Sequence, residues 1–395
     1  MKIEYLEIKN YKQFTDLTLD LTYPKGHEKE GEPLDKICII GQSGTGKTNL
    51  LSLIHGIIDA IRNTNYQDIR DGFINHDGYI KINYKMQNNE SNKIVFTEKE
   101  VTGTTFPKQE KNYLIAVSDQ ENDKIWSVLK RRIDNYNNER LQYINKLSNK
   151  ILNIENYEKK NFQEDIKDWE NKNSNILEQI SDKINEVLIR FNLQLTKIDK
   201  NQEHFTQLTF KDLSNGNIIY YNDVSTGTQN LLSTFIPLKV YNPENGMICI
   251  DEPENSFYPD IQRELTDLYM NVGENNQLIM ATHSPIIASS FEPWEVVELK
   301  FDKNNQIYRE LYYEEENHID NYTLDPRMLT WTGVLTDIFD LKEDSNFSFR
   351  EKKLMEYIRL EKRIKNITDK KEKMVEFEKL MKLSKLLGLS NNEKN

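Results

Sequence analysis

Apolar and polar residues alternate over the first twenty positions of the chain. Ile3, Tyr5 and Ile8 begin the pattern, and a second run extends from Phe14 to Leu21. Alternation of this kind is typical of strands with one buried face, so it predicts a strand pair. Short apolar runs predict further strands: Lys36–Ile40, Tyr79–Tyr84, Lys93–Phe96, Tyr113–Val117, Phe205–Phe210, Ile218–Tyr221, Met247–Ile250, Leu278–Ala281 and Trp294–Leu299.

Other segments repeat apolar residues three and four positions apart, which is the spacing of a helix with one buried face. The predicted helices are Thr48–Ile61, Leu231–Val240, Asp260–Tyr269, Thr330–Phe339 and Arg350–Leu387. Strands that alternate with helices in this way predict an α/β fold. We expect a mixed and parallel sheet with flanking helices, followed by a helical C-terminal appendage.

One long segment, Lys108–Asn215, contains neither glycine nor proline. Its apolar residues form two helical stripes, and Asn156–Asn161 is placed to turn the chain between them. We predict an antiparallel helical hairpin with arms of about 30–35 residues, each about 50 Å long. The alternative is a plain helical subdomain packed on the core, because the stripe skips a step between Tyr136 and Leu141.

These elements predict four parts of the chain. The first, 1–122, is the N-terminal lobe of an α/β head, and 123–192 is the inserted hairpin. The second lobe of the head covers 193–299, and 300–395 is mainly helical.

Composition narrows the classes of function. The chain has 395 residues and a net charge of −12, so as a whole it lacks a strong electrostatic attraction for nucleic acid. Arg350–Asn395 differs, with 14 Lys or Arg against 8 Asp or Glu, a net charge of +6. We interpret this tail as a solvated helix of mixed charge, and a contact with nucleic acid or a partner is the alternative.

Several classes are excluded. No run reaches the roughly 18 apolar residues that a membrane helix needs, and no secretory signal precedes the first strand. Only Cys38 and Cys249 are present, which excludes a disulfide framework and a four-cysteine zinc site. We expect a cytoplasmic protein that makes no membrane contact.

The strongest chemical signal is the run Gly-Gln-Ser-Gly-Thr-Gly-Lys-Thr from Gly41 to Thr48, which fits G-x-x-x-x-G-K-[ST]. It follows an apolar strand and opens a helix, so its backbone N–H groups and the helix N-terminus can hold phosphate oxygens. We expect Lys47 to bridge the β- and γ-phosphates and Thr48 to bind Mg²⁺. The predicted nucleotide-binding residues are Gly41, Gln42, Ser43, Gly44, Thr45, Gly46, Lys47, Thr48 and Asn49.

A second signal lies at Met247–Glu252, where an apolar strand ends in two acids. Acids at the carboxyl end of a strand beside a phosphate loop are placed to act on the bound nucleotide. We predict that Asp251 holds Mg²⁺, directly or through water, and that Glu252 polarises the attacking water. The two signals together predict a catalytic site for ATP and Mg²⁺.

These residues resemble an ATPase of the ABC type, in the branch that includes SMC, RecF and OLD-like proteins. The resemblance covers about Met1–Leu299, and the helical insertion stands where this branch carries its coiled coil. Four further motifs match: Asn10–Phe14 with the turn before the phosphate loop, Gln120 with the Q-loop glutamine, Val224–Thr228 with the signature L-S-G-G-Q, and Ala281–Pro285 with the switch-histidine loop.

The resemblance implies roles for these motifs. His283 would contact the γ-phosphate, and Gln120 would contact the nucleotide and Mg²⁺. Ser225 and Gly227 would approach the γ-phosphate held by a partner subunit, which implies a head-to-head homodimer around two ATP molecules. Thr226 and Thr228 depart from the common signature, which leaves the turnover rate open. An ordinary N-capped helix start is the alternative for this segment.

The run Asp251–Pro259 resembles the D-E-P-E run of OLD-like and defence-associated ATPases. In this chain, Glu254 and Ser256 would lie either across the dimer seam or in a solvated turn. The resemblance therefore extends to prokaryotic antiphage-defence ATPases, such as Septu-like, PARIS-like and retron-associated systems. It implies a sensor and scaffold that controls a separate effector, such as a nuclease, since no nuclease signature follows His283. The alternatives are a RecF-like or SMC-like DNA repair ATPase that clamps DNA and an ATP-locked dimer with little turnover.

Overall fold

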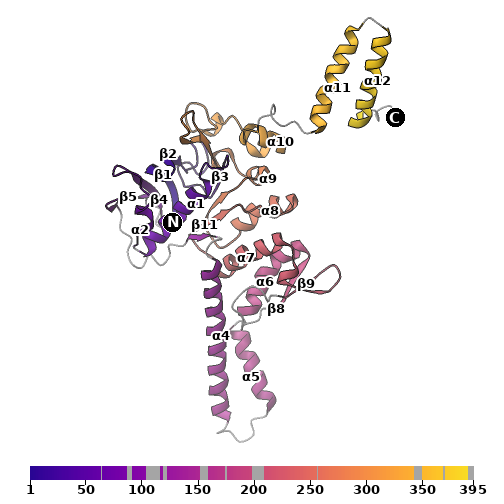
Figure 1. Ribbon diagram of the computed structural model, residues 1–395. Helices are drawn as coiled ribbons and strands as arrows, with labels where there is room; N and C mark the ends of the chain where they lie inside the picture. Colours follow the sequence, from indigo (N-terminus) through magenta and orange to yellow (C-terminus); the bar gives the residue numbers. More distant parts are fainter. Residues whose placement is uncertain are drawn as a thin grey trace. The chain divides into compact units, whose positions relative to one another are not determined.

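The computed structural model describes residues 1–63, 65–86, 91–103, 116–118, 122–151, 159–173, 176–197, 209–255, 257–341, 349–367 and 370–389. The chain divides into two compact units, Met1–Val334 and Leu335–Asn395. The first unit contains parallel and antiparallel sheets with helices, so the predicted α/β fold is confirmed (Figure 1).

A six-stranded sheet forms the centre of the first unit, in the order β14-β13-β3-β12-β11-β7. Its strands are β3 (Lys36–Gly41), β7 (Ala116–Ser118), β11 (Met247–Asp251), β12 (Gln277–Ala281), β13 (Val296–Phe301) and β14 (Ile307–Glu310). All neighbouring pairs are parallel except β13 and β14. Parallel strands are buried on both faces, which explains why β3, β11 and β12 are continuous apolar runs in the sequence.

A second, antiparallel sheet has the order β2-β1-β4-β5-β6 and confirms the predicted N-terminal strand pair. Its strands are β1 (Lys2–Tyr11), β2 (Phe14–Asp20), β4 (Tyr79–Lys85), β5 (Ser91–Thr97) and β6 (Val101–Gly103). The fully buried amide of Gln277 joins the two sheets. It accepts from Ile3 N at 2.8 Å and donates to Ile3 O and Leu34 O at 3.0 and 2.9 Å.

Helix α1 (Lys47–Asn63) contacts β3, β7, β11 and β12, and the short α2 (Gln67–Arg70) packs beside it. Its apolar stripe, from Leu50 to Ile61, is buried in one core with residues of both sheets. This burial fixes the direction of α1, and hence the place of the loop that precedes it.

The inserted segment begins with α4 (Asn122–Ile151) and returns through α5 (Lys159–Lys172) and α6 (Ile176–Leu188). Figure 1 shows α4 and α5 side by side, and the rings of Tyr143 and Trp169 stack between them at 5.5 Å. The hairpin is therefore antiparallel, but its returning arm consists of two helices rather than the single predicted one. The predicted turn at Asn156–Asn161 lies largely outside the described residues, which resume within α5.

A small sheet, β10-β9-β8, follows the insertion: β8 (Leu193–Lys197), β9 (Thr209–Asp212) and β10 (Ile218–Tyr220). Then come α7 (Thr226–Tyr241), α8 (Pro259–Met270) and α9 (Pro285–Ala288). Helix α7 contacts α4 and α6, so the insertion packs against the helix that begins at the signature segment. Most of the predicted strand Phe205–Phe210 lies outside the described residues, and β9 continues past it.

The segment after residue 299 contributes to the first unit. Strand β14 pairs with β13, so it belongs to the head sheet, and the first unit extends through α10 (Trp331–Gly333) to Val334. A π-helix (Val334–Ile338) and the paired helices α11 (Phe349–Asn366) and α12 (Lys370–Leu387) follow. Within the described residues, no helix has both the length and the apolar character needed to cross a membrane.

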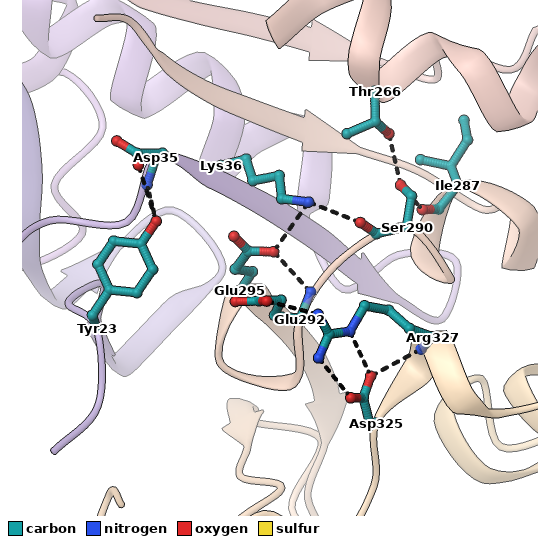
Figure 2. Close-up of polar contacts among 10 residues, drawn as sticks. All are labelled: Tyr23, Asp35, Lys36, Thr266, Ile287, Ser290, Glu292, Glu295, Asp325 and Arg327. Carbon is teal, nitrogen blue, oxygen red and sulfur yellow. Dashed lines mark hydrogen bonds and ion pairs between the residues drawn. The ribbon is translucent and has the colours of Figure 1, made fainter. Parts of the chain in front are cut away.

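A polar cluster around the buried Glu295 holds the start of β3, as Figure 2 shows. Nζ of Lys36 lies 3.5 Å from a carboxylate oxygen of Glu295 and 2.8 Å from Ser290 O. Glu295 also accepts from Glu292 N, and the Glu292 carboxylate pairs with Arg327 at 2.6 Å. Because Glu295 is only 2% exposed, burial raises its pKa to about 7, although Lys36 opposes the shift.

We expect Glu295→Gln to change how stability depends on pH. A carboxyl group whose pKa is raised on folding stabilises the fold below pH 4.5, and this contribution is lost as the pH rises through about 7. The free energy of unfolding of the variant, relative to the wild type, should therefore increase by about 3 kcal/mol from pH 4.5 to pH 8. Urea unfolding at both pH values measures it. The exposed Glu28→Gln is the control, and a pH-independent difference would contradict the prediction.

Candidate functional site

The loop between β3 and α1 depends on its glycines. Gly41, Gly44 and Gly46 have φ angles of 144°, 89° and 85°, which residues with a side chain rarely adopt. A Cβ atom on Gly41 would lie 2.3 Å from Leu299 O, and one on Gly46 would lie 2.0 Å from Nε2 of Gln13. The backbone thus curls tightly at the carboxyl end of β3, immediately before the N-terminus of α1.

Lys47 lies inside this loop rather than in solvent. Its ammonium donates to Gly41 O at 2.9 Å and to Gln42 O at 3.3 Å, and the side chain is buried. Burial lowers the pKa of Lys47. Three nearby carboxylates oppose that shift: Asp251, Glu252 and Glu254. One cation and three acids therefore share this end of the sheet.

The two predicted acids stand where β11 ends. Asp251 is the last residue of β11, pairs in register with Ala281 of β12 and is half-buried. Glu252 is exposed and adopts a left-handed φ of 48°, and its N–H donates to Ala281 O at 2.8 Å. A left-handed conformation at a residue other than glycine costs energy, and such residues cluster at functional sites.

His283 follows β12 by two residues. Because β3, β12 and β11 are parallel neighbours, their carboxyl ends meet at one edge of the sheet. The structure thus brings the loop of Lys47, the acids of β11 and His283 to the same edge. The imidazole of His283 is exposed, while its backbone N–H donates to Oε1 of Glu254 at 2.7 Å.

The signature segment forms the N-terminus of α7. Oγ of Ser225 accepts from Thr228 N at 3.2 Å and lies 2.8 Å from Oγ1 of Thr228, while Gly227 is buried. Ser225 is therefore the N-cap of α7. Capping leaves Ser225 and Thr226 exposed at the positive end of a 16-residue helix.

Two predicted residues, Gln120 and Ser256, lie outside the described residues. The sequence did not predict the side-chain contacts of two further residues, Gln13 and Glu254. Oε1 of Gln13, in the turn between β1 and β2, accepts from Nδ2 of Asn49 at 3.1 Å beside Gly46. Glu254 accepts from the loop after β12. The motif Asn10–Phe14 marked the region of Gln13, but no spacing in the sequence distinguishes either side chain.

The residues fit a nucleotide with Mg²⁺ better than an independent metal ion. In the part of the chain that the structure describes, no three His, Cys, Asp or Glu side chains form a group that could hold a metal ion. Mg²⁺ at phosphate sites takes only one or two protein ligands together with phosphate oxygens and water. Thr48 and Asp251, with phosphates in the glycine loop, would supply that set.

The fold and site define a phosphate-loop ATPase domain. A family model described as "AAA domain, putative AbiEii toxin, Type IV TA system" matches residues 36–289. The match spans more than half of the chain, which therefore belongs to this family of AAA-type ATPase domains. No curated protein matches the sequence significantly.

Similar solved structures are SMC head domains, and the likeness concerns the fold alone. An SmcHead bound to the C-winged helix domain of ScpA is 13% identical, with a TM-score of 0.49 over 78% of this chain and 97% of that one. The SMC head domain from Thermotoga maritima is 13% identical, with a TM-score of 0.43 over 79% of this chain and 99% of that one. A third structure is an Smc head domain with an extended coiled coil, bound to the C-terminal domain of ScpA derived from Pyrococcus furiosus. It is 12% identical, with a TM-score of 0.46 over 78% of this chain and 96% of that one.

We expect Gly46→Ala to weaken Mg–ATP binding about 10-fold or more. The added methyl group would strain a φ of 85° and displace Gln13, at a cost of about 1–2 kcal/mol. Gly56→Ala is the matched control, because nothing lies within 4 Å of a Cβ placed there on α1. Titration of both variants with a fluorescent ATP analogue, with Mg²⁺, measures the affinities. Equal affinities would contradict the role of the loop.

Proposed function

We propose that this chain binds Mg–ATP in the loop 41–48 and hydrolyses it, and that ATP joins two heads into a homodimer. The observation that carries the proposal is the meeting of Lys47, Asp251, Glu252 and His283 at the carboxyl edge of parallel strands. The edge combines a buried cation, acids and a glycine loop, which are the parts that phosphoryl transfer requires.

Each residue has a distinct part in this proposal. Backbone N–H groups of the loop bind the phosphates, and Lys47 exchanges its carbonyl partners for β- and γ-phosphate oxygens. Thr48 and Asp251 hold Mg²⁺, which when bound neutralises charge on the phosphates. Glu252 orients and polarises the attacking water, and His283 contacts the γ-phosphate. Catalysis rests on positioning and on stabilisation of charge.

The dimer is proposed from the signature segment. Exposed Ser225 and Thr226 at the N-terminus of α7 would meet the γ-phosphate of the partner head, where the helix dipole favours an anion. Tyr258, at the start of α8 next to the acidic turn, is 76% exposed and would lie near the same seam. The altered signature still forms a helix N-terminus, where the first backbone N–H groups have no acceptor within the helix.

We further propose that the ATP cycle controls a separate effector, such as a nuclease, in a prokaryotic defence system. The family description, which includes a toxin of a toxin–antitoxin system, supports a role in genetic conflict. The second unit supports attachment of a partner. On α12, Met374, Phe377 and Met381 are each more than half exposed at positions i, i+3 and i+7, along one side of the helix.

We expect Glu252→Gln to lower ATP turnover about 100-fold or more, because the amide cannot accept a proton from water. Since ATP is then retained, the variant should become a dimer with Mg–ATP, whereas Lys47→Ala should remain a monomer. Phosphate release and light scattering after size-exclusion chromatography measure turnover and mass. Wild-type turnover in Glu252→Gln would refute the role of Glu252, and a monomer with ATP would refute the dimer.

A native pull-down tests the effector. Tagged Glu252→Gln, isolated from the host with Mg–ATP, should carry one further protein in a fixed ratio, identified by mass spectrometry. The same preparation in moderate salt distinguishes the DNA-clamp alternative, since contacts with phosphates weaken steeply as salt increases. Recovery of DNA alone, lost in salt, would contradict control of an effector.

A further inference from the structure

Glu254 links two loops of the catalytic edge. Its Oε2 accepts from the Thr282 hydroxyl and its Oε1 accepts from His283 N, both at 2.7 Å. Both donors lie in the loop after β12, whereas Glu254 lies in the turn after β11. The carboxylate thus bridges residues that are 28 and 29 positions apart in the chain.

The other polar groups of the loop after β12 are held as well. Thr282 is buried, its N–H donates to Ile39 O at 3.0 Å, and its hydroxyl accepts from Ser284 N at 2.9 Å. The Ser284 hydroxyl donates to Gln262 at 2.6 Å and accepts from the first N–H groups of α9. The backbone around His283 is therefore fixed, while its imidazole remains exposed.

The turn after β11 is tied to the same loop from its other side, where Glu252 N donates to Ala281 O at 2.8 Å. The turn that carries Glu252 and the loop that carries His283 are thus joined twice, by this backbone hydrogen bond and by the Glu254 carboxylate. We propose that Glu254 is a positioning residue that sets the imidazole of His283 relative to Glu252. The inference rests on the proposed function and adds that Glu254 acts through His283 rather than on the nucleotide.

The hydrogen-bonding chemistry explains why this position requires a carboxylate. A carboxylate only accepts, and both partners donate to it here: His283 through its backbone N–H and Thr282 through its hydroxyl, which in turn accepts from Ser284 N. A glutamine can accept from His283 N and donate to the Thr282 oxygen, so it keeps the bridge in part. An alanine loses it, and an aspartate is one methylene too short to span it. Both oxygens being occupied also distinguishes Glu254 from a residue that reaches across a dimer seam.

The kinetic test compares Glu254→Ala, Glu254→Gln and His283→Ala. We expect Glu254→Ala to lower kcat about 10- to 100-fold, because a misplaced catalytic group loses rate without losing substrate affinity. KM for ATP should stay within about twofold, and Glu254→Gln should recover part of kcat. The double variant should be no slower than His283→Ala alone, since the two residues act as a unit. Multiplied losses or a raised KM would overturn the inference.

Amide hydrogen exchange gives a readout that is independent of ATP turnover. The His283 N–H should exchange at least about 10-fold faster in Glu254→Ala, because its acceptor is gone. Glu274→Ala, which removes an exposed carboxylate before β12, is the matched control and should exchange like the wild type. Unchanged exchange in Glu254→Ala overturns the inference even if ATP is hydrolysed. If exchange is faster in Glu254→Ala but the wild-type chain does not hydrolyse ATP, the proposed function is overturned instead.

Discussion

The parallel pairing of β3, β12 and β11 is the constraint on which the rest of the site depends. Parallel strands need cover on both faces, so their sequences are apolar, and α1 supplies cover by contacting all three. Once these strands are parallel neighbours, the residues that follow Gly41, Ala281 and Asp251 must meet at one edge. Hydrophobic burial of these strands therefore brings the polar groups of the site together.

That constraint explains how much the sequence alone could predict. The glycine loop, the acidic strand end and the histidine loop each carry a local signal, and the sheet that unites them follows from apolar runs. Strand β14 was missed because only Ile307 of its four residues is buried, and β8 because a single capping residue, Asn192, separates it from the helical segment that ends at Phe191. The bridge from Glu254 was missed because its partners are distant in sequence, and such contacts leave no periodic signal.

One strained backbone conformation, that of Glu252, lies where the proposed chemistry takes place. The loop glycines adopt positive φ angles without a Cβ penalty, whereas Glu252 is left-handed although it carries a side chain. Such conformations persist only where the surroundings over-determine them. Here the bond from Glu252 N to Ala281 O and the two bonds to Glu254 supply that support. The D-E-P-E run is thus a turn held in shape by its own second glutamate.

Electrostatics connects the proposed cofactor with the proposed dimer. The edge places three carboxylates near one buried ammonium, Lys47, so it carries excess negative charge before any triphosphate enters. A nucleotide adds several further charges, which Lys47 and the N-terminus of α1 cannot offset alone. Mg²⁺, when bound, would offset part of them, and the N-terminus of α7 from a second head would face what remains. Binding of Mg²⁺ and closure of the dimer would therefore both offset the excess negative charge at this edge. It follows that the two events should be coupled in the proposed cycle.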